Sequence, residues 1–168
     1  MIKVMGCILI VLTGAAIGYL QSKKLTARTA FLEEYQRFLS ELTLQIRYDS
    51  GSLQRIFEKL NGYRYLAPIL KACCQKMKEG ISFLEAWNQG VQRLSSDNGL
   101  LKGDLELLLD LGKGLGISDL EGQLSHLKLN EELAKLRLEE ARESKAKKGK
   151  LYQMLGLSLG ITTALLFL

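Results

Sequence analysis

The sequence predicts an all-α protein: an antiparallel bundle of about six helices carried between two terminal transmembrane helices. Apolar residues recur at helical spacing through the middle of the chain, with one proline and no alternation typical of strands. An uncharged apolar run also stands at each end, and lysines separate both runs from the middle. The chain therefore divides into an extracytoplasmic tip (1–3), a first span (4–20), a bundle (21–150) and a second span (151–168).

Each terminal run is close to the length that a membrane helix needs. Residues 4–20 and 151–168 would each form about 25 Å of helix, against about 30 Å for the hydrocarbon core of a bilayer. Two alternatives stay open: the first run is a cleaved signal peptide, or the second is a buried helix of a soluble domain. The lysines that follow the first run and the lack of a polar face in the second favour anchors.

The net charge of +5 comes from the membrane junctions, where seven cations lie: Lys23, Lys24, Arg28, Lys145, Lys147, Lys148 and Lys150. Between residues 29 and 144, 15 Lys and Arg stand against 18 Asp and Glu, which argues against nucleic acid as a partner. Positive charge beside a membrane helix is retained on the cytoplasmic side. We therefore expect a two-pass protein of the cell membrane with a cytoplasmic bundle, both termini outside, and junction lysines that gain from anionic lipid headgroups.

The helices of the bundle follow one another with short connections. The first span continues into a helix whose apolar stripe runs from residue 31 to residue 46 and which ends at Gly51. Two shorter helices follow over residues 53–60 and 66–77, and Gly80 closes the second of them. These short connections are typical of an antiparallel bundle.

Two S-x-x-E patterns mark the starts of later helices. Ser82 and Glu85 form the first, and Ser118 and Glu121 form the second. In this capping box the two side chains satisfy two amide groups that the first turn of a helix leaves unpaired. The second box predicts the start of a last helix that is continuous into the terminal apolar run.

A turn that could contact a partner is predicted between the last two helices. Residues 112–116, GKGLG, follow a leucine-rich helix and lack the spacing of a phosphate-binding loop. Loops on rigid scaffolds commonly carry binding. Lys113 and Gly114 in this turn, with Asp119 just after it, are therefore the candidate partner contact. An ordinary tight turn is the alternative.

Each terminal run contains one small-x-x-x-small motif, formed by Gly14 and Gly18 in the first and by Gly156 and Gly160 in the second. In lipid there is little hydrophobic drive between helices, so close backbone approach at glycines supplies the packing. These glycines predict a helix–helix contact in the membrane, within one chain or between copies.

The sequence carries no recognisable catalytic or ligand-binding constellation. Its single histidine, His126, has no cysteine or carboxylate at ligand spacing and is expected to be a surface or packing residue. The three cysteines, including the adjacent Cys73 and Cys74, give no metal or disulfide framework. Adjacent acids diverge by about 100° around a helix, so three acid pairs are expected on solvated faces: Glu33-Glu34, Glu131-Glu132 and Glu139-Glu140. We predict no catalytic, cofactor-binding or metal-binding residue and expect a protein that is not an enzyme.

Two segments resemble the cytoplasmic domain of the inner-membrane platform proteins of type II secretion and type IV pilus systems. Residues 80–87, GISFLEAW, are similar to that family's G-x-S-L-x-E-A-L, and residues 112–121, GKGLGISDLE, are similar to its glycine turn. Those proteins carry two such domains and three spans, whereas this chain has one domain between two spans. Lys113 also replaces the acid that follows the first glycine of the turn.

The layout of all 168 residues resembles the stage III sporulation protein AB family of endospore-forming bacteria. The resemblance implies a membrane platform on the mother-cell side of the outer forespore membrane, part of a secretion-like channel complex. It also implies a secretion-type cytoplasmic ATPase and other membrane subunits as partners, and leaves self-association open. The rival interpretation is a regulatory membrane sensor or adaptor without an ATPase; a secreted helical adaptor is a third.

Overall fold

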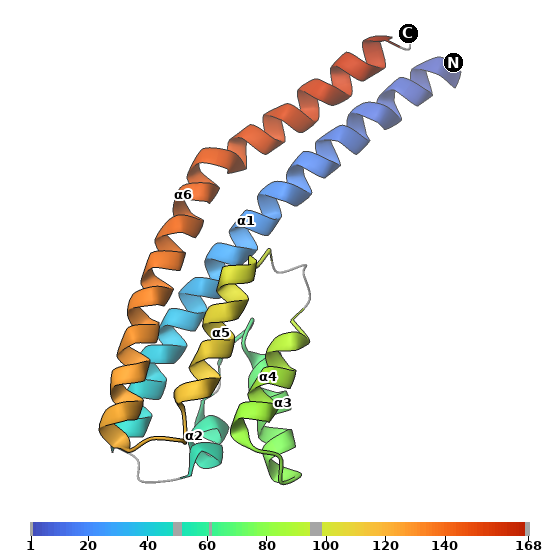
Figure 1. Cartoon of the computed structure of the whole chain (residues 1–168). Coiled ribbons are helices and arrows are strands. Elements are labelled where there is room, and N and C mark those ends of the chain that lie inside the picture. Colours follow the sequence, from blue (N-terminus) through green and yellow to red (C-terminus); the bar gives the residue numbers. More distant parts are fainter. Residues whose placement is uncertain (1, 49–51, 61, 95–98, 167–168) are drawn as a thin grey trace. The chain divides into compact units, whose positions relative to one another are not determined.

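The computed structural model describes residues 2–48, 52–60, 62–94 and 99–166, and every regular element in these ranges is an α-helix. The helices are α1 (Ile2–Tyr48), α2 (Leu53–Lys59), α3 (Ala67–Lys78), α4 (Phe83–Gln92), α5 (Lys102–Gly114) and α6 (Leu120–Leu166) (Figure 1). The all-α class and the bundle of six helices predicted from the sequence are confirmed. The predicted helix end at Gly51 lies outside the described residues.

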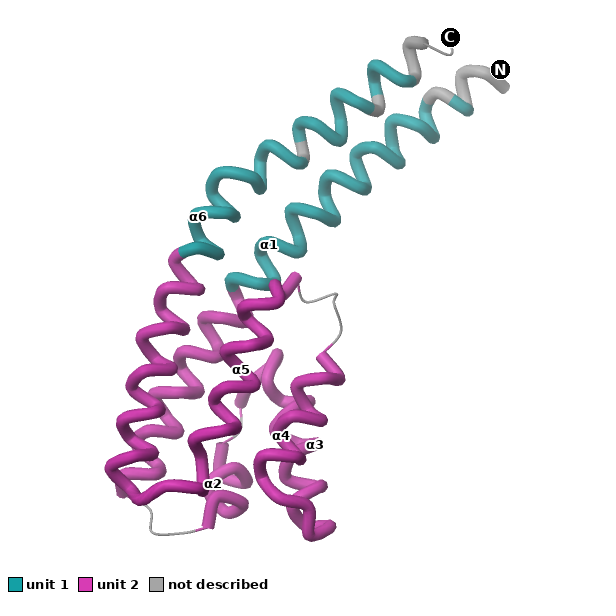
Figure 2. The backbone as a smooth tube through the Cα atoms, viewed as in Figure 1, with its two compact units in different colours: residues 1–29, 140–168 teal, residues 30–139 magenta. Residues whose placement is uncertain are grey.

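The chain forms two compact units (Figure 2). Residues 1–29 and 140–168 make up unit 1, and residues 30–139 make up unit 2. The two long helices, α1 and α6, each contribute residues to both units. Both are 47 residues long and contain no proline, so nothing in their sequence forces an end at the boundary between the units.

The core of unit 2 is a cluster of aromatic rings around Trp87. The Trp87 ring stacks against Phe38 with centroids 6.0 Å apart, and the Phe57 ring meets it edge-on at 5.9 Å. The indole Nε1–H donates to the carbonyl oxygen of Leu108 at 2.7 Å, so the one polar atom of this side chain is satisfied inside the core. These contacts join α1, α2, α4 and α5 in one packed interior.

The predicted stripe on α1 faces this interior. All of its seven members are buried: Phe31, Leu32, Tyr35, Phe38, Leu39, Leu42 and Ile46. The periodic spacing of apolar residues therefore identified the buried face of α1. Leu127, Ala134 and Leu138 of α6 are also buried in unit 2, so the last helix completes the same bundle.

The structure corrects the expected glycine turn between the last two helices. Residues 112–114 are helical, and α5 ends at Gly114, so the link to α6 consists of residues 115–119. Of the glycines in 112–116, Gly116 has a positive φ of 78° and is the one whose backbone conformation requires a glycine. The others are small for packing reasons that the structure makes visible.

Candidate functional site

The glycines of the two terminal runs meet within unit 1. A Cβ atom placed on Gly156 would lie 2.5 Å from the carbonyl oxygen of Gly14 and 3.0 Å from the Cα atom of Gly18. Any larger side chain at residue 156 would therefore push the two helices apart. Gly14, Gly18 and Gly156 form an intramolecular backbone contact, and the side-chain surroundings of Gly160 lie outside what the structure describes.

The same helix pair is held by two further contacts of unit 1. A Cβ atom on Gly149 would lie 3.6 Å from Ser22 Oγ, which is ordinary van der Waals distance. Arg28 is buried, and its guanidinium lies 4.0 Å from the carboxylate of Glu140, which is 57% exposed. The two ends of the chain thus pack along a length of antiparallel helix.

Unit 1 exposes apolar side chains on both of its helices. Among the described residues, one helix, residues 8–48, is long and apolar enough to cross a membrane, and its most apolar window is 6% buried. A core helix of a soluble domain would bury such a window, which this helix does not.

The residues of the candidate partner contact also make contacts within the bundle, which the sequence did not indicate. Lys113 is 68% exposed and forms an ion pair with Asp110 of the same helix at 3.4 Å. Gly114 is half-buried, because it packs against the ring of His126 from α6. Of the three candidate residues, Lys113 and Asp119 are exposed to solvent.

His126 is a packing residue with a defined hydrogen-bond role. Its Nε2 atom lies 3.1 Å from the carbonyl oxygen of Asp110 and 3.2 Å from Asn130 Nδ2. Asn130 Nδ2 donates to the His126 carbonyl oxygen at 3.2 Å. The histidine therefore ties the end of α5 to α6.

Asp119, and not Ser118, caps the start of α6. The amide N–H of Gly122 donates to Asp119 Oδ1 at 3.1 Å, and α6 begins at Leu120. The predicted Ser118–Glu121 capping box is therefore wrong by one position, since an aspartate at the next residue is an equally good cap. Asp119 has a structural role that does not depend on a partner.

The cap predicted for α4 matches the structure in its serine half. Ser82 Oγ accepts from the amide N–H of Glu85 at 3.4 Å. The Glu85 carboxylate accepts from Gln89 Nε2, also at 3.4 Å. The start of α5 has an acidic cap in place of a serine. The Asp104 carboxylate accepts from the amide N–H of Leu101 at 2.8 Å.

Glu34 is the residue whose role sequence reasoning missed. The acid pair that contains it was expected on a solvated face, yet Glu34 is 4% exposed. Its carboxylate accepts three backbone N–H groups, from Arg64 at 2.8 Å, Tyr65 at 2.6 Å and Leu66 at 2.7 Å. These amides precede α3, whose N-cap residue Leu66 has no side-chain oxygen of its own. An acid of α1 therefore supplies the cap of α3.

A cavity of about 440 Å³ lies between α2 and α3. Phe57, Leu70 and the half-buried thiol of Cys74 line it, and Glu58 lies at its edge in a 3.0 Å ion pair with Lys78. Lys78 lowers the pKa of Glu58, whereas burial raises the pKa of the Cys74 thiol. A thiol held protonated is a poor nucleophile and metal ligand, and the described ranges hold no group of three metal-ligating side chains.

Fold and contacts together define a small all-α bundle protein whose two longest helices end in apolar runs packed through glycines. The family model described as stage III sporulation protein AB matches residues 3–168, so the chain belongs to that family. It is a sporulation protein, as the resemblance noted in the sequence predicted.

Individual relatives agree with this assignment. The stage III sporulation protein AB of Bacillus subtilis (strain 168) is 26% identical over 173 residues, which cover 100% of both chains. A solved structure of a stage III sporulation protein AB is similar in fold, with a TM-score of 0.62 at 23% identity. That similarity covers 72% of this chain and 98% of the solved chain.

Proposed function

We propose that the chain is a non-enzymatic membrane platform of a secretion-like channel complex in sporulation, and that its bundle positions a cytoplasmic ATPase. The observation that carries the membrane part is the exposed apolar surface of unit 1. Leu9 and Leu12 of α1 are 61% and 60% exposed, and Met154 and Leu159 of α6 are 67% and 64% exposed. Apolar surface of this extent on both helices of a pair needs a cover, and a bilayer supplies it.

The glycine contact supports the same proposal. In water, two apolar helices associate by burying large side chains, but here the contact is made by backbone at Gly14, Gly18 and Gly156. Packing through small residues is the solution that helices use in lipid, where the large apolar side chains face the acyl chains. Both long helices would then cross the membrane, with the bundle on the cytoplasmic side because the junction cations lie there.

The bundle suits positioning more than chemistry. Its interior is an aromatic and leucine core, and the buried acids Glu34 and Asp104 are hydrogen-bonded to backbone amides. Carboxylates held in this way act as helix caps. A rigid scaffold with Lys113 exposed near the end of α5 is what an ATPase could dock against, as the resemblance to secretion platforms implies.

The membrane arrangement is tested by thiol labelling. In a chain whose native cysteines are replaced, Gln92→Cys places a thiol on the exposed surface of α4, and Leu168→Cys places one at the end of the chain. An impermeant reagent added to intact cells should label residue 168 and leave residue 92 unlabelled until the cells are opened. Labelling of residue 92 alone would invert the proposed orientation.

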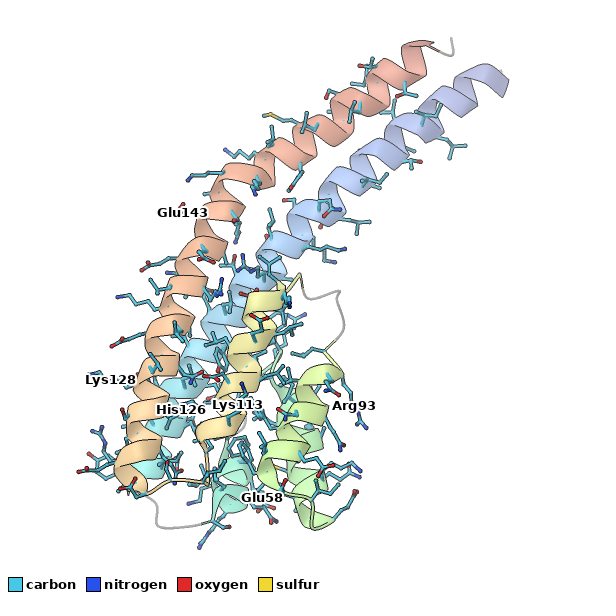
Figure 3. All side chains as sticks on the ribbon, viewed as in Figure 1. Glu58, Arg93, Lys113, His126, Lys128 and Glu143 are labelled. Carbon is cyan, nitrogen blue, oxygen red and sulfur yellow. The ribbon has the colours of Figure 1, made fainter. Side chains whose placement is uncertain are left out.

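The partner is tested by recovery of the ATPase with the full chain from detergent extracts. Lys113→Glu should weaken this recovery with little effect on stability, because the side chain is exposed and its ion pair with Asp110 is local. Lys128→Glu is the matched control, since Lys128 is an exposed lysine on α6 with the same change of charge (Figure 3). If the unaltered chain recovers no ATPase, the platform proposal loses to a membrane sensor or adaptor.

A further inference from the structure

Unit 1 carries a band of exposed basic side chains beside its exposed apolar surface. The band, which we name the cationic collar, consists of six exposed lysines: Lys23, Lys24, Lys145, Lys147, Lys148 and Lys150. Lys23 and Lys24 come from α1 and the other four from α6, so the two ends of the chain contribute to one feature.

The contact between the helices brings these lysines to one level of the pair. Gly149 of α6 packs against Ser22 of α1, with 3.6 Å between a Cβ atom at residue 149 and Ser22 Oγ. Lys23 immediately follows one partner of this contact, and Lys148 and Lys150 flank the other. Successive residues of a helix point about 100° apart, so the lysines surround the pair instead of forming a one-sided patch.

The collar is not neutralised by acids of its own unit. Unit 1 contains nine Lys and Arg against two acids, Glu140 and Glu143. Glu143 is engaged with Lys147 at 3.0 Å, and Glu140 lies 4.0 Å from Arg28. A large positive excess therefore remains around this cross-section of the helix pair.

We propose that the cationic collar binds the headgroups of anionic phospholipids, an inference that rests on the membrane placement proposed above. The combination of charge and apolar surface favours a lipid. Leu20 is 55% exposed and Leu151 is 50% exposed, and each lies within three residues of collar lysines. The stem of a lysine lies along apolar surface while its ammonium group reaches a phosphate. A phospholipid whose headgroup phosphate is bound by these ammonium groups would therefore have its acyl chains against the exposed leucines.

The expected strength is set by the number of lysines at the surface. Each juxtamembrane lysine near an anionic leaflet contributes up to about fivefold in lipid affinity. The attraction between lysine and headgroup falls off over about 10 Å at moderate ionic strength, and this distance shortens as salt is added. The collar should therefore select anionic over zwitterionic phospholipid, and the selectivity should fall as the salt concentration rises.

The test measures which lipid contacts the full chain at the collar. Tyr152→Trp places an indole two residues beyond Lys150, and the chain is reconstituted in mixed vesicles of phosphatidylcholine and phosphatidylglycerol, one of them brominated on its acyl chains. Bromine quenches an indole only at short range, and the signal of Trp87, buried in the bundle, is subtracted with the chain that lacks the substitution. The ratio of the two quenching efficiencies gives the lipid selectivity.

We expect brominated phosphatidylglycerol to quench residue 152 several times more efficiently than brominated phosphatidylcholine. Lys148→Gln with Lys150→Gln should bring the ratio toward one, whereas Lys128→Gln with Lys135→Gln, two exposed lysines of α6 in unit 2, should leave it unchanged. Equal quenching by both lipids, or a ratio that the first pair of substitutions leaves unchanged, overturns the inference. Selective retention of nucleic acid in place of lipid overturns it too.

This design separates the two proposals. Equal quenching by both brominated lipids is consistent with the membrane placement and refutes the binding of anionic headgroups by the cationic collar. Absence of quenching by either lipid means that residue 152 is not in a bilayer, and the membrane placement itself then falls, together with the collar.

Discussion

The Glu34→Gln substitution should lower the free energy of unfolding of the bundle by about 3 kcal/mol. Glu34 Oε2 accepts from the Arg64 amide, and Oε1 accepts from the amides of Tyr65 and Leu66. Glutamine keeps one acceptor oxygen, so at most two of the three bonds survive, and both become neutral. Its NH₂ group faces the remaining amide donor, which is left without an acceptor.

The magnitude follows from these three bonds. A hydrogen bond to a charged group contributes about 1.5–3 kcal/mol and a neutral one about 0.5–1.5, so the two surviving bonds lose about 1 kcal/mol each. The Arg64 amide would be left unpaired, and because Arg64 is an exposed residue that water reaches, the further cost is about 1 kcal/mol, the lower end of the range for an unpaired donor. Glu34→Ala, which leaves all three amides unpaired, should destabilise the bundle further.

Trp87 supplies the assay, because it is the single tryptophan of the chain and is fully buried. Urea titrations of the full chain in mild detergent, followed by indole fluorescence, give the free energy of unfolding of the bundle. Glu132→Gln is the control, since Glu132 is exposed on α6 and the change of charge is the same. We expect it to stay within about 0.5 kcal/mol of the unaltered chain. Equal midpoints for the two variants would refute the role of Glu34 as the cap of α3.

Three further predictions follow from local geometry. Asp119→Ala should lower the stability of the bundle by about 1 kcal/mol, and Ser118→Ala by less than about 0.5 kcal/mol, both measured by the same urea titration. A larger loss for Ser118→Ala would instead support the capping box that the sequence indicated. Gly156→Ile should separate the terminal helices at a cost of about 1–3 kcal/mol, measured by thermal melting of the helical circular dichroism signal in lipid nanodiscs, whereas Gly6→Ile, with nothing within 4 Å of its Cβ position, should not. Burial raises the pKa of the Cys73 thiol from 9.0 to about 12, so the unfolded chain loses this proton at a lower pH than the folded chain. The free energy of unfolding should therefore fall as the pH rises from 9.0 to about 12, by up to about 1.4 kcal/mol per pH unit. Cys73→Ala should remove that part of the alkaline slope, and an unchanged slope would show that the thiol is not buried in the fold.

The helices themselves were predictable because their signals are local. The spacing of apolar residues on α1 depends only on the 3.6-residue period, and each predicted stripe member is buried. The cap of α4 was predicted for the same reason, since Ser82 lies three residues before the amide that it accepts from. The cap of α6 was assigned one residue early because Ser118 and Asp119 are adjacent and both are good caps.

The roles that the sequence did not reveal depend on partners far away in the chain. Gly112 was expected to break a helix, but it lies inside α5, where a Cβ atom would come within 2.6 Å of the Trp87 ring. Gly114 is small for a similar reason, since it packs against His126. Glu34 caps amides 30 residues further on. No pattern within a short window distinguishes such residues from ordinary helix breakers and surface acids.

The place of α6 in the bundle core sets an order for folding during synthesis. Leu127, Ala134 and Leu138 lie on this last helix, and each is 2% exposed or less. A chain that emerges residue by residue from the ribosome therefore carries open apolar surface on its earlier helices until residue 138 has appeared. Incomplete chains of this kind expose hydrophobic surface and aggregate. A finished bundle can therefore form only once the chain has emerged through residue 138.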